Sequence, residues 1–384
     1  MKNLLEKIKI FYLLKFDFSI PPKKKILIID EENVEFLKKF ISKKKFNSVN
    51  IRNKKYNFFI ILKMIFSFKF SFHRYLVEYI KFTKSKIVIT FNDNNINFYK
   101  LKKYFGESKN FVSIQNGIRT EFGDLFGIAK EQKLKNLVSD FILVFGNKIG
   151  HNYKKIIKTK TITIGSLKNN CFKNVKKVNK KNLLYISSFN EKHFKQLNNR
   201  SNKIYQSRGK KKFKYYDIFN TDFELPNQLS IYCKSNNLNF SICGRTNNKI
   251  EKKFYDKIID NQYKFIYRND LSRTYKEILK NFIIVGGPST CMLEALSRKK
   301  RVAIFNVKLS NFERSYNFAW PKKISKKGFF YSNETTFKEV NRVLNNTRNV
   351  NTKKYTKIIK PFKSLMIFDN NNKKFKSFLK KILN

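Results

Sequence analysis

Short apolar runs alternate with longer polar stretches along most of the chain. The apolar runs are rich in Ile, Val and Phe, and several end in Gly, Asn, Asp or Ser. Such runs are typical of parallel strands that are buried on both faces and joined by helices. The first series of predicted strands comprises residues 25–30, 86–91, 111–115, 140–145 and 161–164. The second series comprises residues 183–187, 240–243, 264–267, 282–285 and 301–305.

Two series of strands predict two α/β domains in tandem, each with a parallel sheet flanked by helices. We expect an N-terminal domain over residues 1–166, a polar, lysine-rich linker over 167–182 and a C-terminal domain over 183–350. Residues 351–384 have helical spacing, and we expect them to pack back on the N-terminal domain. Because open parallel sheets bind ligands beyond the carboxyl ends of their strands, the residues that follow each strand are the functional candidates.

The strongest candidate is a glycine-containing turn between a predicted strand and a predicted helix. Glycines let the backbone approach a ligand closely, and the N–H groups and dipole of a helix N-terminus suit phosphate. Ser289 or Thr290 can cap the helix, and Glu294 lies one turn further on, where it could reach a ribose hydroxyl. A tight turn with a capped helix is the alternative; the pattern is neither a P-loop nor GxGxxG. The turn consists of Gly286, Gly287, Pro288, Ser289 and Thr290.

Two further strand ends in the N-terminal half are dense in polar residues. This density suits hydrogen bonding to a polyhydroxylated ligand, although Asx and Gly residues also form ordinary turns. The carboxylates Asp93 and Glu121 are the candidates for a general base, with Asp124 beside them. The candidate residues for binding such a ligand are Asn94, Asn95, Gln115, Asn116, Gly117 and Arg119.

Strand ends in the C-terminal half offer groups that could contact a phosphate. Ser187 and Ser188 follow the first strand of that half, and Arg245 follows the second. A guanidinium can neutralise a diphosphate leaving group, and Arg268 and Arg273 are similar candidates. A surface ion pair is the alternative for each arginine.

The charge of the chain is extreme. Among 384 residues there are 83 Lys and Arg against 27 Asp and Glu, which gives a formal net charge of +56. Lysine is scattered from end to end and accompanies heavy use of Asn, Ile and Phe, a pattern that favours a biased genome over a nucleic-acid-binding surface. We therefore expect no specific nucleic-acid partner, although the positive charge must attract anionic surfaces such as the headgroups of a membrane. The apolar stretch 58–72 is either a buried helix or a helix at a membrane surface.

Cysteine and histidine carry little information about function. The four cysteines are widely separated, and we expect reduced thiols in a cytoplasmic protein. With only three histidines we expect no metal site. The N-terminus lacks the uninterrupted apolar core of an export signal.

The order of several motifs resembles that of a bacterial family of surface carbohydrate biosynthesis proteins. The resemblance covers roughly residues 26–310. It is carried by FNDNNINFYKL, FVSIQNGIRTE, LVFG, ITIGSLKNN, LLYISSF and GGPST…EALSRKKRVAIFN. Such proteins look like glycosyltransferases of the GT-B architecture, with two Rossmann-like domains facing a cleft. Met292 and Leu293 depart from the small and aromatic residues that the family usually has there.

The resemblance implies a glycosyltransferase that acts in O-antigen or capsule synthesis. The C-terminal domain would bind a nucleotide-sugar donor, which is a co-substrate, so no cofactor is expected. The N-terminal domain would hold a glycan or lipid-linked acceptor, at the inner face of the cytoplasmic membrane. Several GT-B capsule and teichoic acid enzymes have Gln-His-Gly where this chain has Gln115-Asn116-Gly117, and Asn116 cannot act as a base. Alternatives are a phosphotransferase with a CDP-glycerol or CDP-ribitol donor, an epimerase of similar shape, and a non-enzymatic polyanion-binding protein.

Overall fold

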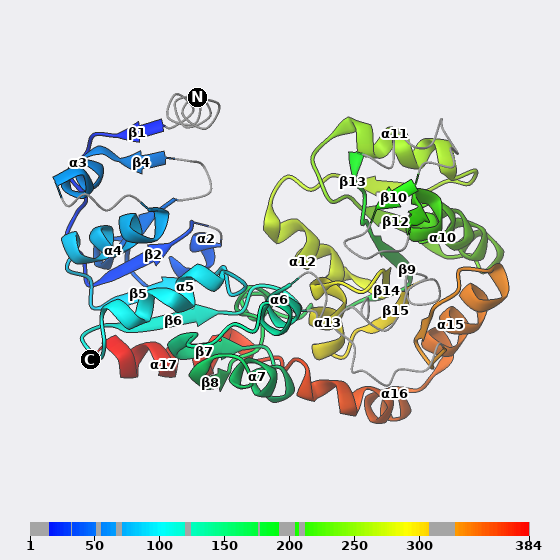
Figure 1. Ribbon diagram of the computed structural model, residues 1–384. Coiled ribbons are helices and arrows are strands. Elements are labelled where there is room, and N and C mark those ends of the chain that lie inside the picture. The colour runs from blue at the N-terminus through cyan, green and yellow to red at the C-terminus, as the bar shows by residue number, and fades with distance from the viewer. Residues whose placement is uncertain are drawn as a thin grey trace. The chain divides into compact units, whose positions relative to one another are not determined.

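The chain folds into two compact units, which are described separately below. The computed structural model describes residues 15–31, 33–50, 55–66, 71–119, 124–175, 177–191, 204–206, 212–306 and 327–383 (Figure 1). Unit 1 comprises residues 1–116, 129–168 and 372–384. Unit 2 comprises residues 117–128 and 169–371.

Unit 1 contains a parallel sheet of six strands in the order β3-β2-β5-β6-β7-β8. The strands are β2 (Ile26–Ile29), β3 (Phe46–Val49), β5 (Ile87–Thr90), β6 (Asn110–Ile114), β7 (Val138–Val144) and β8 (Lys158–Thr163). Every residue of β2 and β5 is buried, which explains their continuous apolar sequence. The helices around this sheet include α2 (Val34–Leu37), α3 (Phe58–Phe66), α4 (Phe72–Phe82), α5 (Ile96–Leu101), α7 (Asn147–Lys154) and α17 (Lys373–Leu383).

Unit 2 contains a second parallel sheet of six strands in the order β13-β12-β9-β14-β15-β16. The strands are β9 (Asn179–Ile186), β12 (Asn239–Cys243), β13 (Lys264–Ile266), β14 (Asn281–Gly286), β15 (Arg301–Phe305) and β16 (Tyr331–Ser332). Its helices include α10 (Tyr215–Ser235), α11 (Lys249–Ile258), α12 (Leu271–Lys280), α13 (Thr290–Ser297), α15 (Phe337–Asn349) and α16 (Thr352–Ile359).

Smaller elements complete the described part of the chain. β1 (Lys15–Asp17) pairs in parallel with β4 (Lys55–Asn57), and β10 (Ile204–Gln206) pairs antiparallel with β11 (Lys212–Lys214). Helices α6 (Leu125–Glu131) and α8 (Leu167–Asn170) each contain residues of both units. The 3-10 helices are η1 (Lys43–Lys45), η2 (Lys102–Tyr104), η4 (Lys360–Ser364) and η5 (Asn370–Asn372).

The two parallel sheets confirm the predicted fold class. Each of the ten predicted strands is a strand in the structure, with ends that differ by a few residues. Strands β3 and β16, which add one strand to each sheet, and the two small strand pairs were not predicted. Within residues 167–182, which we expected to be a linker, Leu167–Asn170 form α8 and Asn179 begins β9.

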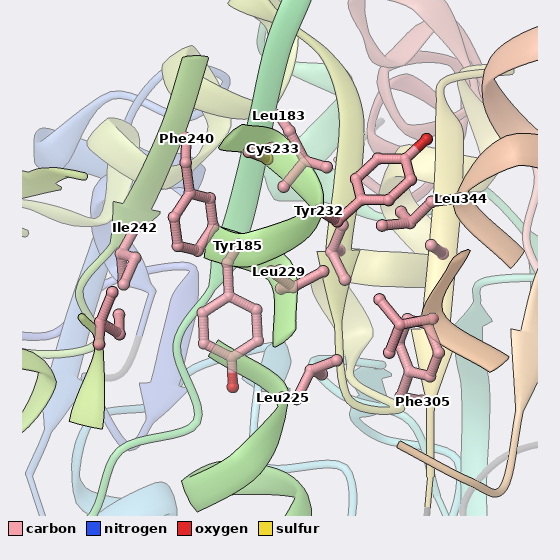
Figure 2. Packing of buried hydrophobic residues seen from close by; sticks show 14 of the residues in the cluster. Leu183, Tyr185, Leu225, Leu229, Tyr232, Cys233, Phe240, Ile242, Phe305 and Leu344 are labelled. Carbon is pink, nitrogen blue, oxygen red and sulfur yellow. The ribbon is translucent and has the colours of Figure 1, made fainter. Parts of the chain in front are cut away.

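The core of unit 2 is an apolar cluster between one face of its sheet and the helices that cover that face. Alternate residues of neighbouring strands point to the same face, so Tyr185, Phe240 and Phe305 lie in one apolar cluster (Figure 2). Helix α10 covers this face with residues such as Tyr232, and α11 adds Phe254, whose ring centroid lies 5.2 Å from that of Phe189.

The end of the chain returns to unit 1. Helix α17 is amphipathic and buries Phe375, Phe378 and Leu379. The ring centroid of Phe375 lies 5.2 Å from that of Phe40, and that of Phe378 lies 5.3 Å from that of Phe141. Residues 372–384 therefore belong to the first unit although α16 belongs to the second.

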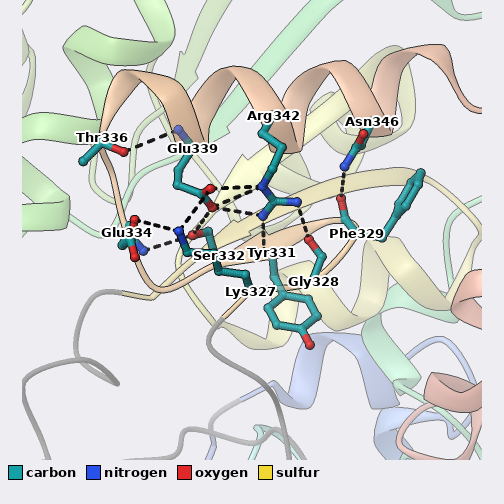
Figure 3. A network of polar contacts seen from close by, with 10 residues as sticks. All are labelled: Lys327, Gly328, Phe329, Tyr331, Ser332, Glu334, Thr336, Glu339, Arg342 and Asn346. Atoms are coloured by element: carbon teal, nitrogen blue, oxygen red, sulfur yellow. Dashed lines mark hydrogen bonds and ion pairs between the residues drawn. The ribbon is translucent and has the colours of Figure 1, made fainter.

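A polar network fixes the start of α15 to β16 (Figure 3). The Glu339 carboxylate accepts hydrogen bonds from Ser332 Oγ at 2.8 Å and from the Arg342 guanidinium at 3.0 Å, and pairs with Lys327 at 3.3 Å. Thr336 caps the same helix turn by accepting from the Glu339 amide. The hydrogen bonds from Arg342, above all, lower the pKa of the Glu339 carboxyl to about 2.

We expect Phe254→Ala to destabilise unit 2 by about 3–5 kcal/mol, because a completely buried ring leaves a cavity when it is removed. Phe337→Ala is the matched control, since that ring is 40% exposed and its loss should cost less than about 1 kcal/mol. Urea unfolding followed by circular dichroism measures both changes. Equal midpoints for the two variants would contradict this assignment of the core.

The contribution of Glu339 to the free energy of unfolding should decrease as the pH falls. Its folded-state pKa of about 2 lies below its value of roughly 4.3 in an unfolded chain. The stabilisation is therefore fully present above about pH 4.3 and is lost as the pH falls towards 2. We expect Glu339→Gln to cost about 2 kcal/mol at neutral pH and progressively less in acid, as measured by urea unfolding at several pH values. Glu334→Gln, at a side chain that is 45% exposed, should show no such convergence.

Candidate functional site

The topology of the unit 2 sheet brings three strand ends together. From the central strand β9 the chain proceeds to β12 and β13 on one side, and then to β14, β15 and β16 on the other. Ile186 at the end of β9 pairs with Cys243 of β12 and with Gly286 of β14. The loops after these strands therefore emerge next to one another at the reversal of strand order, where open α/β sheets bind ligands.

The predicted glycine turn lies at this point, between β14 and α13. Ser289 occupies the N-cap position of α13, but its side chain makes no capping hydrogen bond, which corrects one of our two capping expectations. The other expectation is also corrected, because the Thr290 hydroxyl accepts a hydrogen bond of 3.1 Å from the Ile118 amide rather than from its own helix. Pro288 precedes the N-cap and has no N–H of its own.

Two glycines at this edge have different structural roles. A Cβ on Gly244, directly after β12, would lie 2.8 Å from the Phe265 ring, so a larger residue there would displace that ring. A Cβ on Gly287 would meet only the Phe305 carbonyl oxygen, at 3.9 Å. Packing in this structure therefore leaves room for a side chain at Gly287, which is consistent with a glycine that serves close approach of a ligand.

Glu294 lies on α13 and is 1% exposed. The Tyr275 hydroxyl from α12 donates to its carboxylate at 3.1 Å, and burial raises the pKa of Tyr275 well above its usual range. The structure thus directs Glu294 toward α12, and its expected contact with a ribose hydroxyl stays a prediction.

A buried carboxylate that the sequence analysis missed organises the loops after β9 and β12. Glu251 on α11 is completely buried and accepts hydrogen bonds from the Arg245 amide at 2.8 Å and the Thr246 amide at 2.8 Å. The Ser187 hydroxyl donates to the same carboxylate at 2.5 Å. Ser188, the neighbouring candidate, donates to the Asp222 carboxylate. Both serines therefore bind protein groups in this structure.

The predicted arginines divide into two groups. The Arg245 side chain is exposed at the strand end and donates to the Phe189 carbonyl at 3.3 Å, while Arg268 donates to the Arg245 carbonyl at 3.3 Å. Both therefore lie beside the loop after β12. Arg273 instead pairs with Glu277 one turn along α12, at 3.2 Å, as a surface ion pair.

Two residues that we predicted to bind the acceptor belong to unit 2. Gly117 and Arg119 lie in the segment 117–128. A Cβ on Gly117 would lie 3.7 Å from both Thr290 Oγ1 and the Arg119 guanidinium, which in turn lies 3.6 Å from the Asp124 carboxylate. The structure therefore places Gly117 and Arg119 beside the glycine turn. Glu121, the second candidate base, lies outside the described residues.

In unit 1 the motifs after β5 and β6 are joined by Asp93. Its carboxylate accepts a hydrogen bond from the Asn116 amide at 2.9 Å and another from the Tyr153 hydroxyl of α7. The Asp93 side chain is completely buried, whereas a general base must reach the proton that it removes. Asp93 therefore positions Asn116 in this structure, and its role as a base stays a prediction.

The other candidates in unit 1 also have identified contacts. Gln115 is 3% exposed and accepts a hydrogen bond of 2.8 Å from the Phe145 amide, which ties β6 to the end of β7. Asn116 accepts from Lys168 at 2.7 Å, and Asn95 caps α5 by accepting from the Asn97 amide. Asn94 is exposed in the turn before that helix. Of the five unit 1 candidates, Asn94, Asn95 and Asn116 are thus accessible to a ligand.

Some of the missed residues had a signal in the sequence. Asn248 caps α11 and Glu251 follows three residues later, a spacing that resembles a capping box. Tyr153 and Tyr275 gave no such signal, because an aromatic residue on a helix is ordinarily part of a core. Among the described residues no group of three His, Cys, Asp or Glu side chains could hold a metal ion.

We expect Glu251→Gln to destabilise unit 2 by about 2–3 kcal/mol, because the amide cannot accept from all the buried donors that the carboxylate satisfies. Thermal unfolding measures the change. Glu35→Gln is a suitable control, since that side chain is 77% exposed and its substitution should leave the melting temperature unchanged. Equal melting temperatures for the two variants would show that Glu251 does not hold these loops.

Solved structures with this fold include two bacterial cell-surface and sugar-nucleotide enzymes. The wall teichoic acid polymerase TagF matches with a TM-score of 0.52 and 10% identity, over 94% of this chain and 89% of that one. A protein from Listeria monocytogenes titled "putative UDP-N-acetylglucosamine 2-epimerase" matches with a TM-score of 0.51 and 10% identity, over 89% of this chain and 93% of that one. These similarities confirm the GT-B-like fold.

Sequence comparison identifies the family. No curated protein matches the chain. The model of a family described as "putative O-antigen biosynthesis protein" matches residues 112–383. This match confirms the resemblance to surface carbohydrate biosynthesis proteins, and because it spans most of the chain, the chain belongs to this O-antigen biosynthesis family.

Proposed function

We propose that this protein is a glycosyltransferase that moves a sugar from a nucleotide-sugar donor to a glycan or lipid-linked acceptor. The observation that carries the proposal is the glycine turn 286–290, which opens helix α13 at the reversal of strand order in unit 2. Membership of an O-antigen biosynthesis family supports the same reaction class. The product would be O-antigen or capsule polysaccharide.

The donor would bind with its diphosphate at the N-terminus of α13. There the helix dipole and amide groups favour negative charge, and the open space at Gly287 lets phosphate oxygens approach the backbone. Arg245 at the neighbouring strand end would neutralise further charge. Ser187 and Glu251 would keep the two loops in place. Glu294 is the candidate for the ribose hydroxyls.

The transfer itself needs a new bond and a departing diphosphate. An acceptor hydroxyl would attack the anomeric carbon, and the bond from that carbon to the phosphate oxygen would break, with its electron pair leaving on the nucleoside diphosphate. The groups at the α13 N-terminus would stabilise that leaving group. A carboxylate would take the hydroxyl proton, and Glu121 and Asp93 are the candidates. Asn94, Asn95, Asn116 and Arg119 would orient the acceptor.

A phosphotransferase with a CDP-linked donor is the second candidate, because the fold is similar to that of a wall teichoic acid polymerase. The small number of histidines counts against this candidate: the chain has only three, and asparagine stands at position 116 where a teichoic acid enzyme would have histidine.

A lipid-linked acceptor would place either reaction at the inner face of the cytoplasmic membrane. Within the described residues, no helix is long and apolar enough to cross a bilayer.

The proposal predicts that one nucleotide class will stabilise the protein. At a ligand concentration about a hundred times Kd, mass action should raise the melting temperature by about 5 °C or more. We would measure thermal shifts with UDP, GDP, CMP, CDP and dTDP, and with the corresponding nucleotide sugars. Gly287→Asp should abolish the shift, because a carboxylate would occupy the phosphate position, while the packing leaves room for it in the ligand-free fold.

Matched variants make this experiment decisive. Gly106→Asp introduces the same carboxylate in a turn of unit 1, where the surrounding space is open and aspartate tolerates the backbone φ of +50°, and it should leave the nucleotide shift intact. Selective stabilisation by CDP and CDP-glycerol would favour the phosphotransferase. No response to any nucleotide, together with salt-dependent stabilisation by DNA or RNA, would overturn both candidates in favour of a polyanion-binding protein.

A further inference from the structure

Exposed apolar side chains are concentrated in one region of unit 1. In the part of the chain that the structure describes, ten large hydrophobic side chains are strongly exposed, and six of them precede residue 73. Phe66 is 81% exposed, Ile20 68% and Phe18 65%. Monomeric proteins rarely expose a contiguous apolar patch without a use for it.

Ring contacts join two of these residues, Phe18 and Phe59, through Phe58. The Phe18 ring centroid lies 5.1 Å from that of Phe58, and the Phe58 centroid lies 6.3 Å from that of Phe59. β4 leads directly into α3 and pairs with β1, so these segments lie together in unit 1 (Figure 1). We define the α3 surface as Phe18, Ile20, Phe59, Ile65 and Phe66.

The apolar stretch 58–72, for which we expected one helix, forms α3 over Phe58–Phe66 and the first residue of α4 at Phe72, and residues 67–70 lie outside the described residues. Helix α3 buries Ile60 and Met64, and the ring of Phe66 and the side chain of Ile65 remain exposed. A helix at the surface of a globular protein normally has charged residues on its outer face. Lys63 is the sole charged residue of α3, so this helix is apolar on the outer face as well.

The charges around the α3 surface are predominantly positive. Lys15, Lys23 and Lys55 are exposed near β1 and β4, and Lys63 is exposed on α3. Two carboxylates offset part of this charge, since Asp17 pairs with Lys55 at 3.4 Å and the buried Glu78 pairs with Arg74 at 2.9 Å and with Lys63 at 3.6 Å. Aromatic and aliphatic side chains beside lysines are the composition that binds the interface of an anionic bilayer.

We propose that the α3 surface docks on an anionic phospholipid bilayer, with Phe18 and Phe66 inserted among the headgroups. The nine residues of α3 would extend about 14 Å, roughly half the hydrocarbon thickness, so the helix would lie in the plane of the interface. This inference deepens the proposed function, because it supplies a route to a lipid-linked acceptor. Its test does not require transferase activity.

The test is flotation of the full-length protein with vesicles of phosphatidylcholine, with and without about 30% phosphatidylglycerol. We expect binding to the anionic vesicles that partly survives high salt. The double variant Phe18→Ser/Phe66→Ser should bind about tenfold more weakly, because two apolar rings no longer leave water. Phe337→Ser, which removes an exposed ring from unit 2, should bind like the unsubstituted protein.

Two outcomes would overturn the proposal. If the double variant binds as tightly as the unsubstituted protein, the overall charge alone drives adsorption. If light scattering shows a dimer that the double variant converts to a monomer, without a change in flotation, the α3 surface is an interface between two copies of the chain. The double variant must retain its melting temperature and its nucleotide response, which separates a failure here from a failure of the proposed function.

Discussion

The backbone of β9 is hydrogen-bonded on both sides, and this constraint determines where ligand chemistry can lie in unit 2. Its partners β12 and β14 run parallel to it and end at the same level, at Cys243 and Gly286. After each of these three strands the chain turns, so three loops lie close together at this edge of the sheet. Glu251 then fixes two of those turns, because it accepts from the Arg245 and Thr246 amides after β12 and from the Ser187 hydroxyl after β9. In the glycine turn, by contrast, Gly287 has room for an added side chain.

The sequence predicted the two sheets well, because a parallel strand buried on both faces has an unmistakable composition. β2 reads ILII and β15 reads RVAIF, and both were identified. β3 reads FNSV and is buried only at its two ends, so its composition resembles that of a loop. The short pair of β1 and β4 depends on a contact between segments far apart in the sequence, which no local pattern reveals.

The candidate site was predicted less completely, since sequence shows which residues follow a strand but not which way their side chains point. Asp93 and Gln115 follow strands and Glu294 lies on a helix as expected, yet each is buried and hydrogen-bonded to another part of the protein. Carboxylates are scarce in this chain, and several of them are buried and bind other groups of the protein. The buried ones in the described part are Asp30, Glu78, Asp93, Asp222, Glu251, Glu277, Glu294 and Glu339. The outer surface is consequently dominated by lysine.

The chain passes between the two units four times, at residues 116/117, 128/129, 168/169 and 371/372. Neither unit is therefore a continuous gene segment. A recombination event with a single crossover would separate α17 from the strands that it covers, or the segment 117–128 from Thr290. Shuffling of the two units, which is simple for domains that follow one another in the sequence, would here require several coordinated crossovers. Lineages of this protein should consequently have inherited both halves together and acquired new specificity by substitution within them.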